Sequence, residues 1–421
     1  MINIYKNNYI KVFLFSIIIR IVYLLFSYTS EINFTSCCDF QRYNIISNRI
    51  LSGNFDMSAE NFIAAPLFPI FMAISKLLSL DNFVIIIQIF QILISSVSVI
   101  YIMKITKILF EDKRVVLISG LLSSVYPFTF WYVIFLGQEI LFQSLLIVSI
   151  YYLCKFLKKK KNKFLFIFSI LFTLSMLTKS HIILFVPFVL IIFIIQFDKC
   201  LKKIIKSSLI FFVTIFLVSL PNSLNNINKH GYYILSSTGA GYHFLVAHND
   251  DFYKWTFDPP KKNSQEYKRL FSMKYNITKK IDFDNVGLNQ KQLDKLRFSE
   301  GLIWIFENPK KKLYLILRNL KNFLQPGFSK NHHSFDKWLV SFIVSFPIFV
   351  LCYFGIIKNV VNDFKNHTII LSLFFMMLSF FIIFYTQNRF RVITIEPFYI
   401  IYTSYSVNYI LNFFFQKFKK I

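Results

Sequence analysis

The sequence predicts an all-α membrane protein that crosses the bilayer about ten times. Hydrophobic residues make up 55% of the 421 residues and charged residues only 16%, below the roughly 25% of an ordinary soluble domain. The 47 Lys and Arg residues, against 21 Asp and Glu, lie in short clusters between long apolar runs. Because they do not form one basic face, we expect no nucleic acid among the partners.

About ten apolar stretches approach the 20 residues that a membrane helix needs. They cover residues 10–28, 82–103, 115–134, 138–157, 164–179, 181–197, 207–223, 338–357, 368–386 and 392–414. The first has no small-residue cleavage site, so we expect a retained span and not a signal peptide. Residues 66–80 are apolar but short and open with Pro66-Leu67-Phe68-Pro69, which is typical of a re-entrant or interfacial helix or of a tilted span.

The basic clusters predict the orientation. If residues 66–80 do not cross, all clusters fall on one side with both termini: Lys104 to Arg114, Lys155 to Lys163, Lys199 to Lys206, Lys358 with Lys365, and Lys417 to Lys420. Because short inner loops carry an excess of Lys and Arg, we expect an N-in, C-in topology with ten spans. A crossing at 66–80 would turn the run Lys158 to Lys161 outward, against this bias.

This topology divides the chain into three parts. Residues 1–224 would form an N-terminal transmembrane module with the first outer loop, 29–80; residues 225–337 would form an outer-face subdomain between the seventh and eighth spans; residues 338–421 would form the C-terminal membrane helices. Within the outer-face subdomain we expect two helices, from Leu293 to Phe306 and from the helix-starting Pro309 to Leu324. Loops of this length are usually functional.

Ionisable residues from distant parts of the chain gather at the predicted outer face. They are Asp39, Arg42, Glu139, Lys179, His181, Arg389 and Arg391. Each residue also has a possible structural role without function in catalysis or binding. An Arg or Lys can anchor a helix end, an acid can cap a helix, and a His can form a hydrogen bond at the membrane boundary. Charged groups at the membrane boundary are nevertheless costly unless they are paired or used. Together they favour group transfer from a lipid phosphate, which basic side chains would hold while a carboxylate takes a proton from the acceptor.

Several short motifs also occur in one order. They are Asp39-Phe40-Gln41-Arg42-Tyr43 with Ala65-Pro66-Leu67-Phe68-Pro69; Tyr126-Pro127 with Gly137-Gln138-Glu139; Leu177-Thr178-Lys179 with Pro187; Ser237 to Tyr242 with Ala247-His248-Asn249; and Asn308-Pro309 to Arg318 with Arg389-Phe390-Arg391 to Pro397. In this order they resemble the membrane glycosyltransferases of the C superfamily. The resemblance is to bacterial relatives of dolichyl-phosphate-mannose protein mannosyltransferases and of the lipid A aminoarabinose transferase, which are glycosyltransferase family 39-like.

The resemblance implies an inverting transferase that takes a sugar from an undecaprenyl- or dolichyl-phosphate-type carrier and gives it to a glycan, lipid or protein acceptor of the cell envelope. Asp39 would be the catalytic base and Glu139 a second acidic or acceptor-positioning group. The substrate-binding candidates are Arg42, Tyr43, Lys179, His181, His243, Asn249, Arg389 and Arg391, with Lys179 and Arg389 or Arg391 as the phosphate clamp. Asp39 is a lone acid between Cys38 and Phe40, so no metal is named and a divalent cation stays open as a cofactor.

The expected location is the bacterial inner membrane, with membrane lipids as partners and the site facing the periplasm or exterior. Two other classes stay open. An O-antigen or polysaccharide polymerase or ligase would share the many spans and the large outer loop, but it is not expected to carry the pattern from Asp39 to Pro69. A flippase or transporter of lipid-linked sugars would bind at the bilayer midplane, where these spans carry few charges. The sequence does not name the sugar or the acceptor.

Overall fold

The computed structural model describes residues 2–30, 32, 34–35, 39–58, 62–79, 81–258, 265, 287–328, 334–384 and 387–418. Within these residues the regular elements are all helices, and the β contact is an isolated antiparallel bridge between Ser58 and Ile63. The predicted all-helical class is therefore confirmed.

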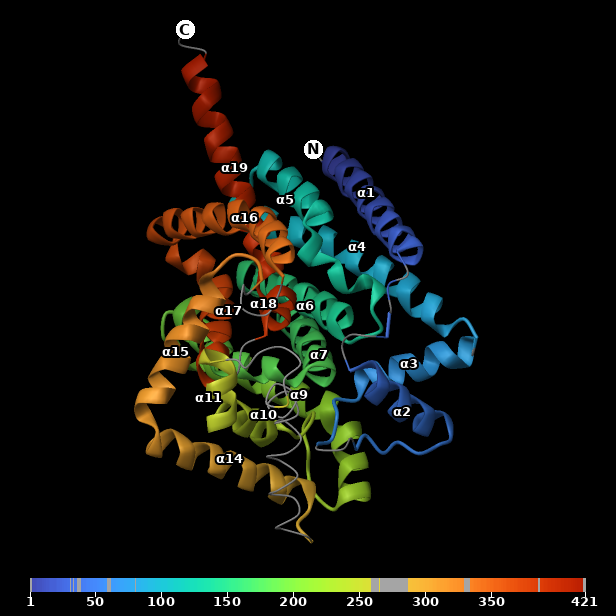
Figure 1. Ribbon diagram of the computed structural model, residues 1–421. Coiled ribbons are helices and arrows are strands. Elements are labelled where there is room, and N and C mark those ends of the chain that lie inside the picture. The colour runs from blue at the N-terminus through green and yellow to red at the C-terminus, as the bar shows by residue number, and fades with distance from the viewer. Residues whose placement is uncertain are drawn as a thin grey trace.

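The helices fall into two length classes (Figure 1). The long ones are α1 (Ile2–Thr29), α4 (Phe83–Phe110), α6 (Glu139–Lys159), α9 (Leu201–His230), α16 (Phe335–Asn362), α17 (Phe364–Ile383) and α19 (Glu396–Phe418). The shorter ones are α2 (Phe40–Leu51), α3 (Leu67–Leu78), α5 (Lys113–Val125), α7 (Asn162–Thr178), α8 (Val186–Gln196), α10 (Ala240–Ala247), α11 (Asp250–Phe257), α14 (Gln290–Glu307), α15 (Pro309–Leu324) and α18 (Asn388–Thr394). Three 3₁₀ turns join them: η1 (Pro127–Thr129), η2 (Trp131–Ile134) and η3 (Ser180–Phe185).

Six helices in the described part of the chain are long and apolar enough to cross a membrane: α1 from Asn7 onward, α4, α6, α9, α16 and α17. The helix α7, the segment Ser180–Gln196 and the 12-residue helix α3 are apolar but shorter. At about 1.5 Å per residue, α3 reaches only about 18 Å, well short of the roughly 30 Å hydrocarbon layer. The count of ten spans and the side on which each loop lies therefore stay predictions.

The predicted span 115–134 is wrong in its second half. Helix α5 ends at Val125, because a residue that precedes proline, here Tyr126 before Pro127, is pushed out of the helical region. The chain continues as η1 and η2. The predicted span 392–414 is likewise divided at Ile395, after which α19 begins at Glu396. The two predicted helices of the outer-face subdomain are confirmed as α14 and α15, the latter with Pro309 as its first residue.

Buried glutamines hold the η1–η2 segment in place. Their side-chain amides donate to its carbonyl oxygens at 2.8–3.0 Å: Gln88 to Ile134, Gln91 to Val133 and Phe135, and Gln143 to Thr129. Buried carbonyls need such partners when no helix supplies them. The glutamines thus fix the irregular segment that leads into Glu139 at the start of α6.

A charged side chain, Arg20, lies inside the first span. Arg20 is 1% exposed, and its Nε donates to Ser95 Oγ of α4 at 2.9 Å. Its guanidinium also lies over the Phe130 ring, 5.1 Å from the centroid. Charged groups within a span are costly, and Arg20 is accommodated by a hydrogen bond to α4 and a cation–π contact with the η1–η2 segment.

Different segments of the chain form the two ends of the molecule. The two chain termini lie at one end of the molecule, whereas α2, α10, α11 and α14 lie toward the other (Figure 1). The main apolar core lies between these ends, where Phe168 and Phe172 of α7 pack on Phe211 of α9 with ring centroids 5.6 and 5.5 Å apart. The same core includes Leu146 and Ile150 of α6, so it holds α6, which begins at Glu139, against α7, which Lys179 directly follows.

Labelling of single cysteines tests the predicted orientation. In a background without the five native cysteines, a maleimide that cannot cross membranes should label Lys295→Cys on α14 in intact cells and should miss Lys159→Cys at the end of α6. Both lysines are exposed, so the difference would report the side of the membrane. Labelling of Lys159→Cys without prior permeabilisation would contradict the N-in, C-in topology.

Candidate active site

Asp39 stands at the start of α2 in a left-handed backbone conformation, with φ 66° and ψ 28°. Asp tolerates this region better than most residues, because its short polar side chain bonds locally. Its carboxylate lies 3.5 Å from Nη1 of Arg42, one turn along the helix, and 3.6 Å from Nη2 of Arg389. The Asp39 side chain keeps 33% of its surface exposed, so a ligand can reach it.

Glu139 opens α6 and is buried, with a side chain that is 1% exposed. Its Oε1 accepts a hydrogen bond from Lys179 Nζ at 3.0 Å. Lys179 directly follows the last residue of α7, and its side chain is 6% exposed. Its Oε2 is buried and has no hydrogen-bond partner among the described residues. A buried carboxylate oxygen without a donor is costly, so this atom is suited to receive a donor group from a ligand.

Arg389 of α18 joins the two acids. Its Nη2 faces Asp39 at 3.6 Å and its Nη1 faces Glu139 Oε1 at 3.8 Å. Both distances exceed hydrogen-bond length, so these are charge contacts and not hydrogen bonds. The start of α2, the start of α6, the end of α7 and the start of α18 thus bring three cations (Arg42, Lys179 and Arg389) to two carboxylates.

The charges around Asp39 hold its carboxylate in the ionised form. Burial alone would raise the pKa of Asp39, but the positive charges of Arg389 and Arg42 outweigh it and set the pKa below its usual value. Lys179 and His243 act in the same direction more weakly. Asp39 is therefore a base that is ready to accept a proton at neutral pH.

A glycine-rich turn ties the surrounding loops together. Thr238 exchanges two hydrogen bonds with Ile63 of the first loop, at 2.8 and 3.0 Å, and Ser237 Oγ bonds Ser180 Oγ beside Lys179 at 2.7 Å. Gly239 has φ 111°, and a Cβ there would lie 3.1 Å from the Phe62 side chain. Glycine adopts this positive φ without strain and has no Cβ to clash with Phe62, so the turn can pack closely against that side chain.

Phe62 contacts two residues near Asp39. The Arg42 guanidinium lies 4.5 Å from the Phe62 ring centroid, and the ring centroid of the half-buried His243 lies 5.9 Å from that of Phe62. Phe390 makes a similar contact with Lys179, whose Nζ lies 4.8 Å from the centroid of its ring. Sequence reasoning assigned no role to Phe62 or Phe390, because aromatic residues make up 19% of the chain and give no local signal.

Three predicted substrate contacts have structural partners instead. Tyr43 is 4% exposed and packs edge-on against Phe68 at 5.1 Å. Asn249 caps α11: its Oδ1 accepts the Phe252 N–H at 2.8 Å, while its Nδ2 donates to carbonyls of α10. His181 lies among aromatic rings, with Nε2 3.1 Å from Thr394 Oγ1. We therefore leave Tyr43, Asn249 and His181 out of the proposed substrate contacts.

Arg391 points away from the acids that Arg389 faces. It is 1% exposed, its Nε donates to Glu396 Oε1 at 2.8 Å, and Tyr126 Oη donates to Glu396 Oε2 at 2.8 Å. Its two terminal nitrogens donate to carbonyl oxygens at the end of α15, those of Asn322, Phe323, Gln325 and Gly327. With its donors used in this way, Arg391 fits a structural anchor for α18 and not the phosphate clamp.

Loss of the Arg391 side chain should destabilise the protein strongly. Arg391→Met leaves Glu396 as an uncompensated buried charge and removes donors from four carbonyls, which should cost about 3 to 5 kcal/mol of unfolding free energy. Arg391→Met/Glu396→Gln should lose less, because no unpaired charge remains. Thermal unfolding of the detergent-solubilised protein measures both, with Arg389→Met as the control. An unchanged melting temperature in Arg391→Met would contradict the anchoring role.

The site does not fit a divalent cation held by the two acids. Asp39 and Glu139 share the Arg389 guanidinium, which an ion bound by both carboxylates would have to displace. Across the described ranges, moreover, no group of three or more His, Cys, Asp or Glu side chains is arranged to hold a metal ion. The chemistry below is therefore derived from side chains alone.

Comparison with known proteins agrees with this fold. Residues 64–223 match the family model described as dolichyl-phosphate-mannose-protein mannosyltransferase, a part that holds Glu139 and Lys179 but neither Asp39 nor Arg389. The archaeal oligosaccharyltransferase AglB from Archaeoglobus fulgidus, in complex with an inhibitory peptide and a dolichol-phosphate, superposes with a TM-score of 0.56 at 13% identity, over 96% of this chain and 50% of that one. The chain has the glycosyltransferase C fold. The predicted resemblance to this superfamily is confirmed.

Two further structures of the Archaeoglobus fulgidus oligosaccharyltransferase share the glycosyltransferase C fold with this chain. The complex with Zn and sulfate gives a TM-score of 0.55 at 14% identity, over 96% of this chain and 49% of that chain. The form tethered to an acceptor peptide gives 0.58 at 13% identity, over 96% and 50%. The search of curated proteins found no match. The chain, an integral membrane protein, spans about half the length of these oligosaccharyltransferases.

Proposed function

We propose that this protein is a membrane glycosyltransferase that moves a sugar from a polyprenyl-phosphate donor to a cell-envelope acceptor, with Asp39 as the general base. The observation that carries the proposal is the bridge from Asp39 through Arg389 to Glu139 and Lys179. It joins a partly exposed base to a cluster of cations around the start of α6, a candidate membrane span, where we place the lipid phosphate. The glycosyltransferase C fold adds support.

We propose that Arg389 and Arg42 bind the phosphate group of the lipid-linked donor. Both side chains are partly exposed, at 22% and 32%, and both contact Asp39 loosely, whereas Lys179 is buried and committed to Glu139. Arginine suits a phosphate because its planar fork offers paired donors. Three cations against two acids leave one surplus positive charge. That surplus favours a single phosphate group over a diphosphate.

The proposed reaction is a direct displacement at the anomeric carbon. Asp39 takes the proton from an acceptor hydroxyl or amine as the new bond to the anomeric carbon forms. The bond from that carbon to the phosphate oxygen breaks on the opposite face, so the sugar is inverted, and the electron pair leaves with the phosphate. Arg389 and Arg42 stabilise the growing charge on the leaving phosphate, and no general acid is required.

We assign the site to the outer face of a bacterial inner membrane, within the proposed division into residues 1–224, 225–337 and 338–421. A polypeptide acceptor is favoured over a glycolipid, since AglB is described with peptides and a dolichol-phosphate. The transferase is favoured over a polymerase or ligase because the matching family model is that of a mannosyltransferase. The transferase is also favoured over a flippase, because a flippase would bind the lipid-linked sugar at the bilayer midplane, whereas this site lies at the ends of helices.

Mass spectrometry of surface glycoproteins and glycolipids, with and without the gene, tests the proposal. We expect one sugar residue to disappear from a defined acceptor, and re-expression of the protein to restore it. Identical profiles from the two strains, under conditions where the protein is produced, would contradict the proposed function.

Arg42→Gln should move the pH profile of transfer. The positive charge of Arg42 helps to hold the pKa of Asp39 below its usual value. Without that charge the pKa of Asp39 rises, so Asp39 becomes protonated at a higher pH and the acidic limb of kcat/KM shifts upward. Arg49→Gln on the same helix is the matched control, because Arg49 bonds the Ser58 carbonyl instead. An acidic limb unchanged in Arg42→Gln would count against Asp39 as the base.

A further inference from the structure

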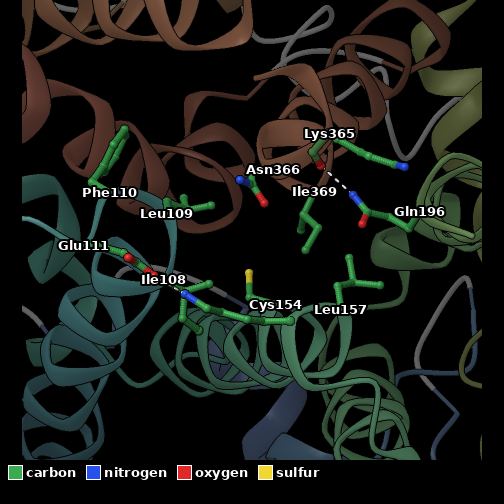
Figure 2. Close-up of a pocket in the computed structure, with 11 residues that line it drawn as sticks. Ile108, Leu109, Phe110, Glu111, Cys154, Leu157, Gln196, Lys365, Asn366 and Ile369 are labelled. Atoms are coloured by element: carbon green, nitrogen blue, oxygen red, sulfur yellow. Dashed lines mark hydrogen bonds and ion pairs between the residues drawn. The ribbon is translucent and has the colours of Figure 1, made fainter. Parts of the chain in front are cut away.

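A cavity of about 450 Å³ opens among the ends of α4, α6, α8 and α17, away from the candidate active site (Figure 2). Helix α6 connects the two places, with Glu139 at its start and Lys158 near its end. At 1.5 Å per residue these residues are about 28 Å apart, close to the roughly 30 Å thickness of the hydrocarbon layer. The cavity and the active site therefore lie at opposite membrane surfaces.

The cavity has an apolar floor and a polar rim. Cys154 and Leu157 of α6 and Ile369 of α17 line the floor, and Cys154 and Asn366 approach the space from opposite helices (Figure 2). The rim carries Glu111, Lys158, Gln196, Lys365 and Asn366. Such a site suits an amphipathic ligand, with a polar group at the rim and methylene groups below it.

The rim is positively charged. Lys158 pairs with Glu111, and Lys365 Nζ lies 2.5 Å from Asp198 Oδ1, but all four side chains stay 45% or more exposed. Two more lysines are near: burial and then the charges of Lys365 and Lys203 lower the pKa of Lys160. Among the residues that line the cavity, the two lysines Lys158 and Lys365 stand against one acid, Glu111. Each ammonium has three donors, so it can bond its acid and an incoming anion together.

We propose that this cavity binds the phosphate headgroup of an anionic phospholipid from the lysine-rich membrane surface. Basic pockets between membrane helices at such a surface bind anionic headgroups. Lys158 and Lys365 donate to the phosphate from the two sides of the cavity, while the floor takes the first methylene groups of the lipid. The site stands apart from sugar transfer and holds whether or not the proposed function is correct.

Native mass spectrometry of the delipidated full chain tests the site, with phosphatidylglycerol as the probe and phosphatidylcholine and inorganic phosphate as comparisons. Lys158→Gln/Lys365→Gln should weaken phosphatidylglycerol binding about 25-fold, since each lysine contributes about fivefold. Asn366→Trp should block the site sterically without removing a positive charge. Lys202→Gln/Lys206→Gln, which removes two exposed lysines at the start of α9, should leave binding unchanged.

Each other outcome overturns the proposal. Equal binding by all variants would show that the lipid binds elsewhere. Equal losses in the two lysine pairs would show general surface attraction. Displacement of the lipid by an equal concentration of inorganic phosphate, or equal binding of phosphatidylcholine, would show that an anionic lipid headgroup is not the ligand.

Discussion

Replacement of Asp39 by Asn is expected to lower kcat/KM for sugar transfer by at least about a hundredfold, because a positioned general base contributes about that much or more. The change removes the proton acceptor at nearly constant volume. Asn also tolerates the left-handed conformation in which Asp39 is held, at φ 66°, so the start of α2 should keep its geometry. Initial rates with purified protein at saturating donor measure the effect.

Asp56→Asn is the matched control for this substitution. Asp56 lies in the same loop, and its pKa is also below the usual value: burial opposes the shift, and hydrogen bonds from Ser58 together with the charge of His230 outweigh it. Its partners are Ser58 and His230, which lie outside the proposed set of catalytic and phosphate-binding residues, so its replacement should leave transfer near the native rate. Native turnover in Asp39→Asn, with both variants inserted and folded, would remove Asp39 from the mechanism.

Arg389→Ala should raise the KM for the lipid-phosphate donor by about tenfold to a hundredfold, because charge-assisted hydrogen bonds to an anion contribute about 1.5 to 3 kcal/mol. The KM for the acceptor should change much less. Arg389→Lys should recover only part of the loss, since an ammonium keeps the charge but cannot present a paired fork. Steady-state kinetics with donor and acceptor varied separately provide the measurement.

Arg114→Ala serves as the control for a general loss of positive charge. Arg114 lies near the start of α5 and bonds Asn412 of α19, so it has no contact with the candidate site. Donor KM should stay at the native value in this variant. If Arg389→Ala raised the acceptor KM as much as the donor KM, the assignment of Arg389 to the phosphate would be wrong.

Much of the helical architecture can be predicted from the long apolar runs and from residues that start or end helices. Long apolar runs predict α1, α4, α6, α9, α16 and α17, while Pro309 marks the start of α15. The stretch after Tyr126 could not be predicted in the same way, because residues 127–134 are as apolar as a span. Glutamine side chains on α4 and α6 bond carbonyl oxygens of this irregular backbone, and local sequence patterns do not reveal those contacts.

The candidate site was partly predictable because charges are rare near these spans. Asp39, Glu139, Lys179 and Arg389 stood out for that reason, and the structure brings them together. The pair Arg389 and Arg391 could not both face the acids, since residues two apart on a helix point about 200° from each other. Only the knowledge that 388–394 is helical separates the two arginines.

Transfer by the purified protein from a radiolabelled polyprenyl-monophosphate sugar, in lipid nanodiscs without added metal, tests directly whether Asp39 is the base in transfer from a monophosphate donor. We expect a panel of such donors to contain one that labels a peptide or glycolipid acceptor, with inversion at the sugar, and we expect Asp39→Asn to lose this labelling while Asp56→Asn keeps it. Transfer from a polyprenyl-diphosphate donor alone, or equal labelling by the Asp39→Asn variant, would contradict this expectation.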